Sequence, residues 1–225
     1  MAQMLQEKFS SDRHLLFANR HVRLSQRETG AAFLVKDIQP PILTLENAVA
    51  ATAAKQKERF YTYDAVVFCD GILDNEVQNV YDTCARIDRE SGSAPILSKI
   101  FPTGRVSDIK EAPLMQEPLV VKRLIERIQA LGPQHPLTSS ITGLQAKVTE
   151  CDNTIAIFDK LSEELAICKV QEDIAQRKLR DQYRLNYLHA QENQGKRTAE
   201  LLFPAIAAGP KPVETNTPES QPVVA

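Results

Sequence analysis

The chain has 225 residues, of which 43% are hydrophobic, and 27 basic against 29 acidic side chains give it a formal net charge of -2. This apolar content is enough for a folded core, which excludes a wholly disordered chain. The near balance of charge excludes a global attraction to nucleic acid or acidic membranes, so any such binding must come from a local patch.

The first residues, MAQMLQEKFSSDRHLLF, lack the apolar segment of a secretory signal, and no run approaches the roughly 20 apolar residues of a membrane span. We therefore expect a cytoplasmic protein. Its cysteines lie on or beside apolar helical positions, too far apart in sequence for a close metal pair. We expect reduced thiols there, with no metal site and no cofactor. The four are Cys69, Cys84, Cys151 and Cys168.

Residues 1–41 form an N-terminal segment for which we expect a short helix followed by a loop. Helical segments are indicated over 2–9 and 12–21, although the stretch after them also allows a hairpin around Gly30. Pro40-Pro41 closes the segment. Because proline is tolerated in the first turn of a helix, a long helix is expected to begin directly after this pair, at about residue 42.

Two stretches without proline, 42–94 and 137–203, carry apolar residues at helical spacing. Proline inside a helix costs roughly 3 kcal/mol, so its absence over such spans favours long helices. Gly71 interrupts the first stretch, which suits a close helix crossing or a bend. The first apolar seam consists of Phe60, Tyr63, Val66, Cys69, Leu73, Val77, Val80, Cys84 and Ile87.

Four prolines and a glycine between 95 and 118 predict a long loop, with a turn of helix near 96–101. A short third helix should then start at Pro118 and end at Gly132.

The second proline-free stretch has the most regular heptad-like pattern in the chain. It predicts one helix from 137 to 203, although a break near 170–174 into two helices would give a more compact bundle. We favour the continuous helix, because no glycine or proline marks a break there. Its seam consists of Leu137, Ile141, Leu144, Val148, Cys151, Ile155, Phe158, Leu161, Leu165 and Cys168.

The composition changes after Pro204 to proline, small and polar residues, which predicts a disordered tail over 205–225. Such a tail is either a flexible terminus or a short recognition peptide. The fold expected from the whole sequence is all-α: an elongated helical bundle over 42–204 with two long helices, a short third helix and a disordered C-terminal tail.

Catalytic chemistry has little support in the sequence. No Gly-rich phosphate loop, nucleophile elbow or Glu-x-x-His pair is present, so no catalytic residue is assigned and the protein is more plausibly not an enzyme. Asp70 and Asp74, one helical turn apart, form either a solvated helix flank or a pair that shares a proton. The second alternative predicts a ligand-binding or catalytic bundle in which both acids and the Tyr63 region line an internal pocket.

Charge is divided between the two long stretches: residues 62–90 are acidic, whereas 176–198 are basic. Opposite signs favour a side-by-side arrangement of these segments. The basic segment also allows a nucleic-acid-binding adaptor, with arginines on phosphates and tyrosines stacked on bases. The candidate interaction residues are Arg177, Arg180, Arg184, Tyr183 and Tyr187.

The run DGILDNEVQNVYDTCARID over 70–88, followed by IFPTGRVSDI over 100–109 and a long terminal helix closing on LLFP at 201–204, resembles bacterial all-helical proteins of unassigned role. The resemblance is one of layout, and it implies no residue roles.

We expect a structural or protein-interaction module that associates with itself, as a dimer, or with another protein through its helical seams. Seams of this length need more apolar coverage than one short helix supplies. The ligand-binding bundle and the nucleic-acid adaptor are the alternatives, and no membrane partner is expected.

Overall fold

The computed structural model describes residues 2–91 and 95–205. Within them the chain forms seven α-helices and one 3-10 helix, and its only extended pairing is an isolated bridge between Ala2 and Pro204. The all-α prediction is therefore confirmed for this part of the chain. The helices are α1 (Ser11–Ser25), α2 (Ala32–Ser91), α3 (Leu97–Ile100), α4 (Ser107–Lys110), α5 (Glu117–Gln129), η1 (Pro136–Ser140), α6 (Ile141–Gln194) and α7 (Lys196–Leu202).

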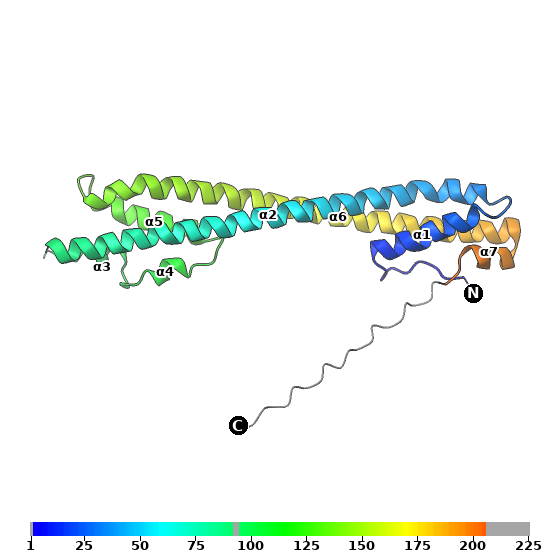
Figure 1. Ribbon diagram of the computed structural model, residues 1–225, viewed down its shortest axis with the longest axis horizontal. Coiled ribbons are helices and arrows are strands. Elements are labelled where there is room, and N and C mark those ends of the chain that lie inside the picture. Colours follow the sequence, from blue (N-terminus) through cyan, green and yellow to red (C-terminus); the bar gives the residue numbers. More distant parts are fainter. Residues whose placement is uncertain (1, 92–94, 206–225) are drawn as a thin grey trace, which may run out of the picture. The chain divides into compact units, whose positions relative to one another are not determined.

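The chain divides into two compact units, and both long helices contribute to each of them (Figure 1). Unit 1 comprises Met1–Val49 and Glu172–Ala225, and unit 2 comprises Ala50–Gln171. This division does not coincide with the boundary that the sequence suggested after residue 41. The predicted tail lies outside the described residues, apart from Ala205. No helix in the described part of the chain is both long enough and apolar enough to cross a membrane.

The first long helix starts earlier than predicted: α2 begins at Ala32 and runs through Pro40 and Pro41. Each proline removes one backbone hydrogen bond, which frees the carbonyls of Lys36 and Asp37. Both of these residues lie at exposed positions, where water can satisfy the carbonyls. The apolar face of the same segment is fully buried, and that burial offsets the cost.

The second long helix is continuous through 170–174, as predicted, but it ends at Gln194. Gly195 follows with a φ of 83°, a conformation that suits glycine, and the separate helix α7 starts at the next residue. The turn predicted near 96–101 is α3, whereas α4 was not anticipated. The N-terminal segment contains α1 rather than a hairpin, but the helix indicated over 2–9 does not form. Ser10 accepts a capping hydrogen bond from the Arg13 amide.

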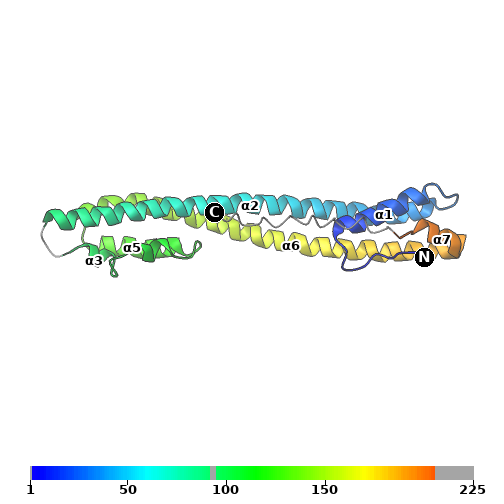
Figure 2. The ribbon, with the colours of Figure 1, turned by 60° about the horizontal axis from the view of Figure 1, so that its bottom comes forward.

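Unit 1 packs α1 and α7 against the first part of α2 and the last part of α6 (Figure 2). Its core is rich in aromatic rings: Tyr183 and Phe203 meet edge to face with ring centroids 4.9 Å apart, and His21 stacks on Phe203 at 4.0 Å. Burial of these large side chains supplies most of the stability of such a core.

A polar network is enclosed in the core of unit 1. The Nδ1 atom of His21 lies 3.2 Å from the Leu202 carbonyl oxygen, and its Nε2 lies 3.2 Å from the amide nitrogen of Asn186. Asn186 also donates to the carbonyl of Leu34 at 2.7 Å. A neutral imidazole protonated on Nδ1 satisfies both contacts. Burial lowers the pKa of His21 to about 4, so the ring is neutral at pH 7.

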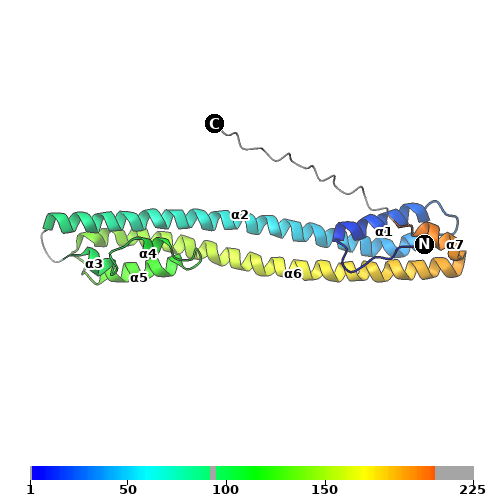
Figure 3. The same cartoon turned by 90° about the horizontal axis from the view of Figure 1, so that it is seen from below.

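In unit 2 the two long helices run antiparallel: the residue numbers of successive contacts between them increase along α2 and decrease along α6. Lys55 pairs with Glu164 at 2.9 Å, and the Arg59 side chain donates to Ser162 at 2.8 Å. Further along, the Cys69 thiol reaches Thr154 at 3.8 Å. Figure 3 shows α3, α4 and α5 beside the last part of α2, and their apolar residues share its core.

Only some residues of the predicted seams are buried in these cores. The six positions of the first seam from Val66 to Cys84 are buried, whereas Phe60 and Tyr63 are exposed. Asp88 has a structural role: its carboxylate accepts hydrogen bonds from the backbone amides of Ile96 and Leu97 and so caps α3.

The predicted pairing of the acidic and basic segments is not found within either unit. Residues 62–90 belong to unit 2 and residues 176–198 to unit 1, and each segment packs into the core of its own unit. An antiparallel hairpin of long helices places the end of the first helix beside the start of the second, and burial decides this register because exposed ion pairs contribute only about 0–1 kcal/mol each.

Candidate interaction surface

The outer face of α2 in unit 2 carries large apolar side chains in solvent. Phe68 is 70% exposed, Phe60 is 61% exposed and Tyr61 is 60% exposed. Successive helical residues are rotated by about 100°, so Phe68 points away from the buried Val66 and Leu73. The first long helix therefore has a second face with apolar side chains, and its own unit leaves that face uncovered.

This face follows a regular pattern. Its positions alternate in steps of four and three, the spacing of a helix seam that packs against another helix. At 1.5 Å per residue the row is about 38 Å long. Seven of its eight members are exposed, and Gln78 is half-buried. We call this row the outer stripe; it consists of Lys57, Tyr61, Asp64, Phe68, Gly71, Asn75, Gln78 and Asp82.

A shallow hollow lies at the middle of the outer stripe, where Gly71 has no side chain. The hollow has a volume of about 500 Å³ and is bordered by Val67, Phe68 and Ile72, with Asp64 and Asn75 at its ends. A Cβ atom built on Gly71 would meet nothing within 4 Å. The close crossing that the sequence suggested at Gly71 is thus not made within the unit, and the position is open to another chain.

The exposed aromatic side chains of the outer stripe do not contribute the stabilisation that their burial would provide. Burying an aromatic side chain of this kind contributes about 1.5–3 kcal/mol, and exposed apolar clusters mark interaction sites more often than isolated exposed residues do. At the edges of the outer stripe, Lys57 lies 5.6 Å from the centre of the Tyr61 ring, and Gln78 donates to Asp82 at 3.0 Å. The surface therefore has an apolar centre, a basic end and an acidic end.

A group of acids lies elsewhere in unit 2, where α5 meets α2. Glu117, the first residue of α5, is 1% exposed and faces Asp70 and Asp74. Within the part of the chain that the structure describes, no group donates a hydrogen bond to either oxygen of Glu117. Burial first, and then the two neighbouring acids, raise the pKa of Glu117 to about 9. The Glu117 carboxyl is therefore neutral at pH 7.

The Cys151 thiol, close to Glu117, is unreactive. Cys69 and Cys151 lie beside Glu117, and burial together with Cys69 raises the pKa of Cys151 to about 12. A thiol that stays protonated is a poor nucleophile and a poor metal ligand. The crevice lined by these residues leaves no room for a water-sized molecule, and Tyr63 does not line it. This arrangement is a packed polar contact and not an internal ligand pocket.

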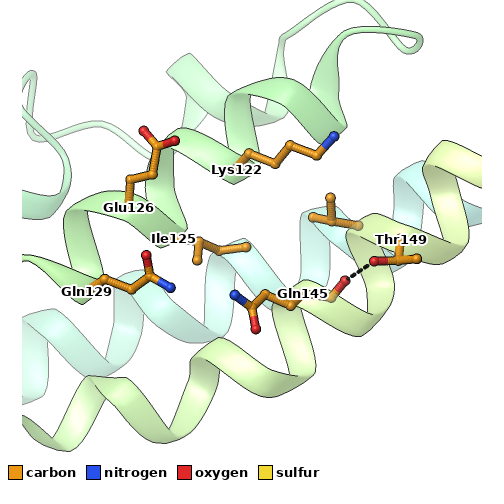
Figure 4. A pocket seen from close by; sticks show the side chains of 7 residues that line it. Lys122, Ile125, Glu126, Gln129, Gln145 and Thr149 are labelled. Atoms are coloured by element: carbon orange, nitrogen blue, oxygen red, sulfur yellow. Dashed lines mark hydrogen bonds between the residues drawn. The ribbon is translucent and has the colours of Figure 1, made fainter. Parts of the chain in front are cut away.

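A larger groove of about 540 Å³ lies between α5 and α6. Figure 4 shows Gln129 of α5 and Gln145 of α6 pointing toward one another across it, with Ile125 between them. At one end Lys122 forms an ion pair of 2.7 Å with Asp152. The groove lacks a cluster of catalytic groups, and its polar side chains are ordinary surface amides and charges.

The interaction residues predicted on the basic segment all lie on α6 in unit 1. Arg177 and Arg184 are exposed and Arg180 is half-buried, all on α6 in unit 1. Tyr183 is 1% exposed, so its ring is not available to stack on a base. Tyr187 packs against Phe203 and accepts a hydrogen bond from Gln191. The role of the three arginines stays a prediction.

Among residues 2–91 and 95–205, no three His, Cys, Asp or Glu side chains are grouped so as to hold a metal ion. All four cysteines are free thiols. Comparisons of the chain with models of known protein families, with curated proteins and with solved structures find no match.

Reasoning from the sequence assigned Phe60 to the core and overlooked Phe68 and Glu117. The missed signal for Phe68 was a second row with the same three-and-four spacing on the opposite face of the helix, hidden because only two of its eight members are aromatic. Glu117 directly precedes Pro118 at a helix start, where an acid is ordinarily an exposed and favourable residue, so nothing local indicated its burial.

Proposed function

We propose that this protein is a structural or protein-interaction module that associates with a second copy of itself through the outer stripe of α2. The observation that carries the proposal is the exposed row centred on Phe68 and the Gly71 hollow, on the face opposite the core of unit 2. The proposal differs from the expectation drawn from the sequence in its surface: the seams predicted for association are largely used inside the two units.

The proposal includes an elongated helical bundle in a cytoplasmic setting. Support for the setting comes from the four free cysteines, three of them buried, which suit a reducing compartment. Support for a binding role over a catalytic one comes from unit 2: the raised pKa values of Glu117 and Cys151 keep both groups protonated at pH 7, and the crevice beside them has no room for a water-sized molecule.

Sedimentation equilibrium of the full chain at micromolar concentration tests the proposal. We expect a species of twice the chain mass of 25.1 kDa. Phe68→Glu should shift it to the monomer, because an aromatic side chain at the centre of an interface contributes about 2 kcal/mol or more and a buried carboxylate opposes contact.

Leu119→Glu is the matched control, since Leu119 is 52% exposed on α5 in the same unit but lies off the outer stripe. It should leave the mass unchanged. Circular dichroism would verify that both variants keep the helical content of the parent. A mass of 25.1 kDa for the parent chain at every concentration would contradict the proposal.

A further inference from the structure

We infer that the second copy lies antiparallel along the outer stripe, with Phe68 of each copy seated in the Gly71 hollow of the other. This inference rests on the proposed self-association and adds its geometry. The two-fold axis then passes between Cys69 and Asp70, and the same eight positions face one another in four kinds of pair. The pairs are Phe68 with Gly71, Asp64 with Asn75, Tyr61 with Gln78, and Lys57 with Asp82.

Shape supports this register at the centre. Phe68 is the most exposed aromatic residue described on α2, and Gly71, one turn further on, leaves the hollow of about 500 Å³. A large side chain opposite a glycine lets two helices approach closely, whereas two facing aromatic rings hold them apart. Val67 and Ile72, which border the hollow, meet one another across the axis and enclose the ring.

Charge supports the same register at both ends. Lys57 and Asp82 are the outermost members of the row and carry opposite signs, so the antiparallel arrangement forms this ion pair twice. Nearer the axis the Asp64 carboxylate faces the side-chain amide of Asn75, which can donate a hydrogen bond to it. Every acid of the outer stripe thus faces a donor or a cation.

Other registers lose these matches. A parallel, in-register pair places Lys57, Asp64 and Asp82 each against its own copy, which gives three layers of like charge. An antiparallel pair shifted by seven residues in one direction sets Asp64 against Asp82, and the opposite shift sets Asp64 against Phe68. The second of these shifts also avoids like charges and sets Tyr61 against Gly71, but Asp64 then faces an aromatic ring and Asp82 lies beyond the paired residues of the outer stripe. Of these registers, only the one centred between Cys69 and Asp70 gives each acid of the outer stripe a donor or a cation.

Charge exchange tests the register by sedimentation equilibrium and mass photometry of the full chain. Lys57→Glu or Asp82→Lys alone should weaken the dimer about tenfold, because each places two like-charged pairs in the interface. The double variant Lys57→Glu/Asp82→Lys should restore parental affinity. In a parallel dimer the double variant restores nothing, because each residue still faces its own copy.

Two glycine substitutions provide a second test of the register. Gly71→Leu fills the hollow and should abolish the dimer. Gly143→Leu is the matched control: Gly143 is an exposed glycine of α6 whose added Cβ also meets nothing within 4 Å. It should leave the dimer intact.

The outcomes separate the two proposals. A parent chain that is monomeric overturns both. A dimer that Phe68→Glu dissociates, but that survives Gly71→Leu and is not restored by the double charge exchange, overturns the register and leaves self-association through the outer stripe in place.

Discussion

His21 of unit 1 and Glu117 of unit 2 are both buried ionisable side chains, but their surroundings are opposite. In unit 1, His21 has hydrogen-bond partners at both ring nitrogens, and Asn186 connects it to the backbone of α2. In unit 2, Glu117 is buried among carboxyl groups: it can donate its own proton to Asp70 or Asp74, but in the described residues no other group donates a hydrogen bond to its oxygens. A satisfied buried network helps to specify one packing, whereas an unsatisfied one costs stability.

This difference gives the two units opposite responses to pH. Burial favours the neutral form in both cases, but the neutral form is the deprotonated state of a histidine and the protonated state of an acid. The pKa of His21 is therefore lowered and that of Glu117 is raised. We expect acid to weaken unit 1 and base to weaken unit 2.

The largest expected effect belongs to His21. The pKa of His21 is about 4 in the folded unit, against an ordinary value of 6.5 for histidine. Between these two pH values the unfolded chain therefore binds one more proton than the folded chain. The free energy of unfolding of unit 1 should fall by about 3 kcal/mol as the pH drops from about 6.5 to about 4. Hydrogen exchange of α1 peptides across this range measures the loss.

His21→Gln should flatten that pH dependence, whatever it does to stability at pH 7. Some slope should persist, because burial also lowers the pKa of His14 in the same unit. The control is His189→Gln, a half-buried position on α6 outside this network. If the free energy of unfolding of His21→Gln depends on pH as steeply as that of the parent, the pH dependence does not arise from the His21 ring.

An intermediate effect is expected for Glu117→Gln. The amide cannot ionise and offers two N–H donors to Asp70 and Asp74 where the neutral acid offers one O–H, so the free energy of unfolding of unit 2 at pH 7 should rise by about 1–3 kcal/mol. In the parent, the folded state binds the extra proton between pH 4.5 and about 9, and stability falls as the pH rises through that window. The variant should lose this fall.

Hydrogen exchange of α5 peptides at pH 6 and pH 9 reads out the change. Glu126→Gln, an exposed acid on the same helix, should behave like the parent. A Glu117→Gln variant that is less stable than the parent at pH 9 would show that the buried carboxyl stabilises unit 2. That result would contradict the claim that base weakens unit 2 through Glu117.

The smallest effect concerns the polar links between the long helices. Unit 1 joins them by the buried Asn186, whereas unit 2 uses the partly exposed Lys55, which contacts Glu58 at 2.7 Å and Glu164 at 2.9 Å. Lys55→Ala should lower the free energy of unfolding of unit 2 only slightly, because water screens this exposed ion pair.

This small loss should shrink further in 1 M salt, which screens exposed charges. Gln56→Ala, at the adjacent exposed position, provides the baseline in a urea titration. A loss that is large and independent of salt would show that the link is not a surface ion pair.

The sequence predicted most of the helical framework because its signals are local. The three-and-four spacing from Val66 to Cys84 and the absence of proline identify both long helices. The start of α2 was missed because Pro40-Pro41 is locally a helix start, and only tertiary burial around the pair carries the helix through it. The end of α6 was missed because an isolated Gly195 is a weak signal.

The candidate surface was less predictable. Which face of α2 packs inward depends on contacts with distant helices, so the spacing alone could not separate the buried row from the outer stripe. The same limit explains Tyr183: its basic neighbours indicated a surface, but His21 and Phe203 cover its ring in the folded unit.

Sedimentation equilibrium of the full chain beside Phe68→Glu tests self-association through the outer stripe most directly. We expect twice 25.1 kDa for the parent and 25.1 kDa for the variant at the same concentration. Equal masses for the two chains, whether monomeric or dimeric, would contradict it.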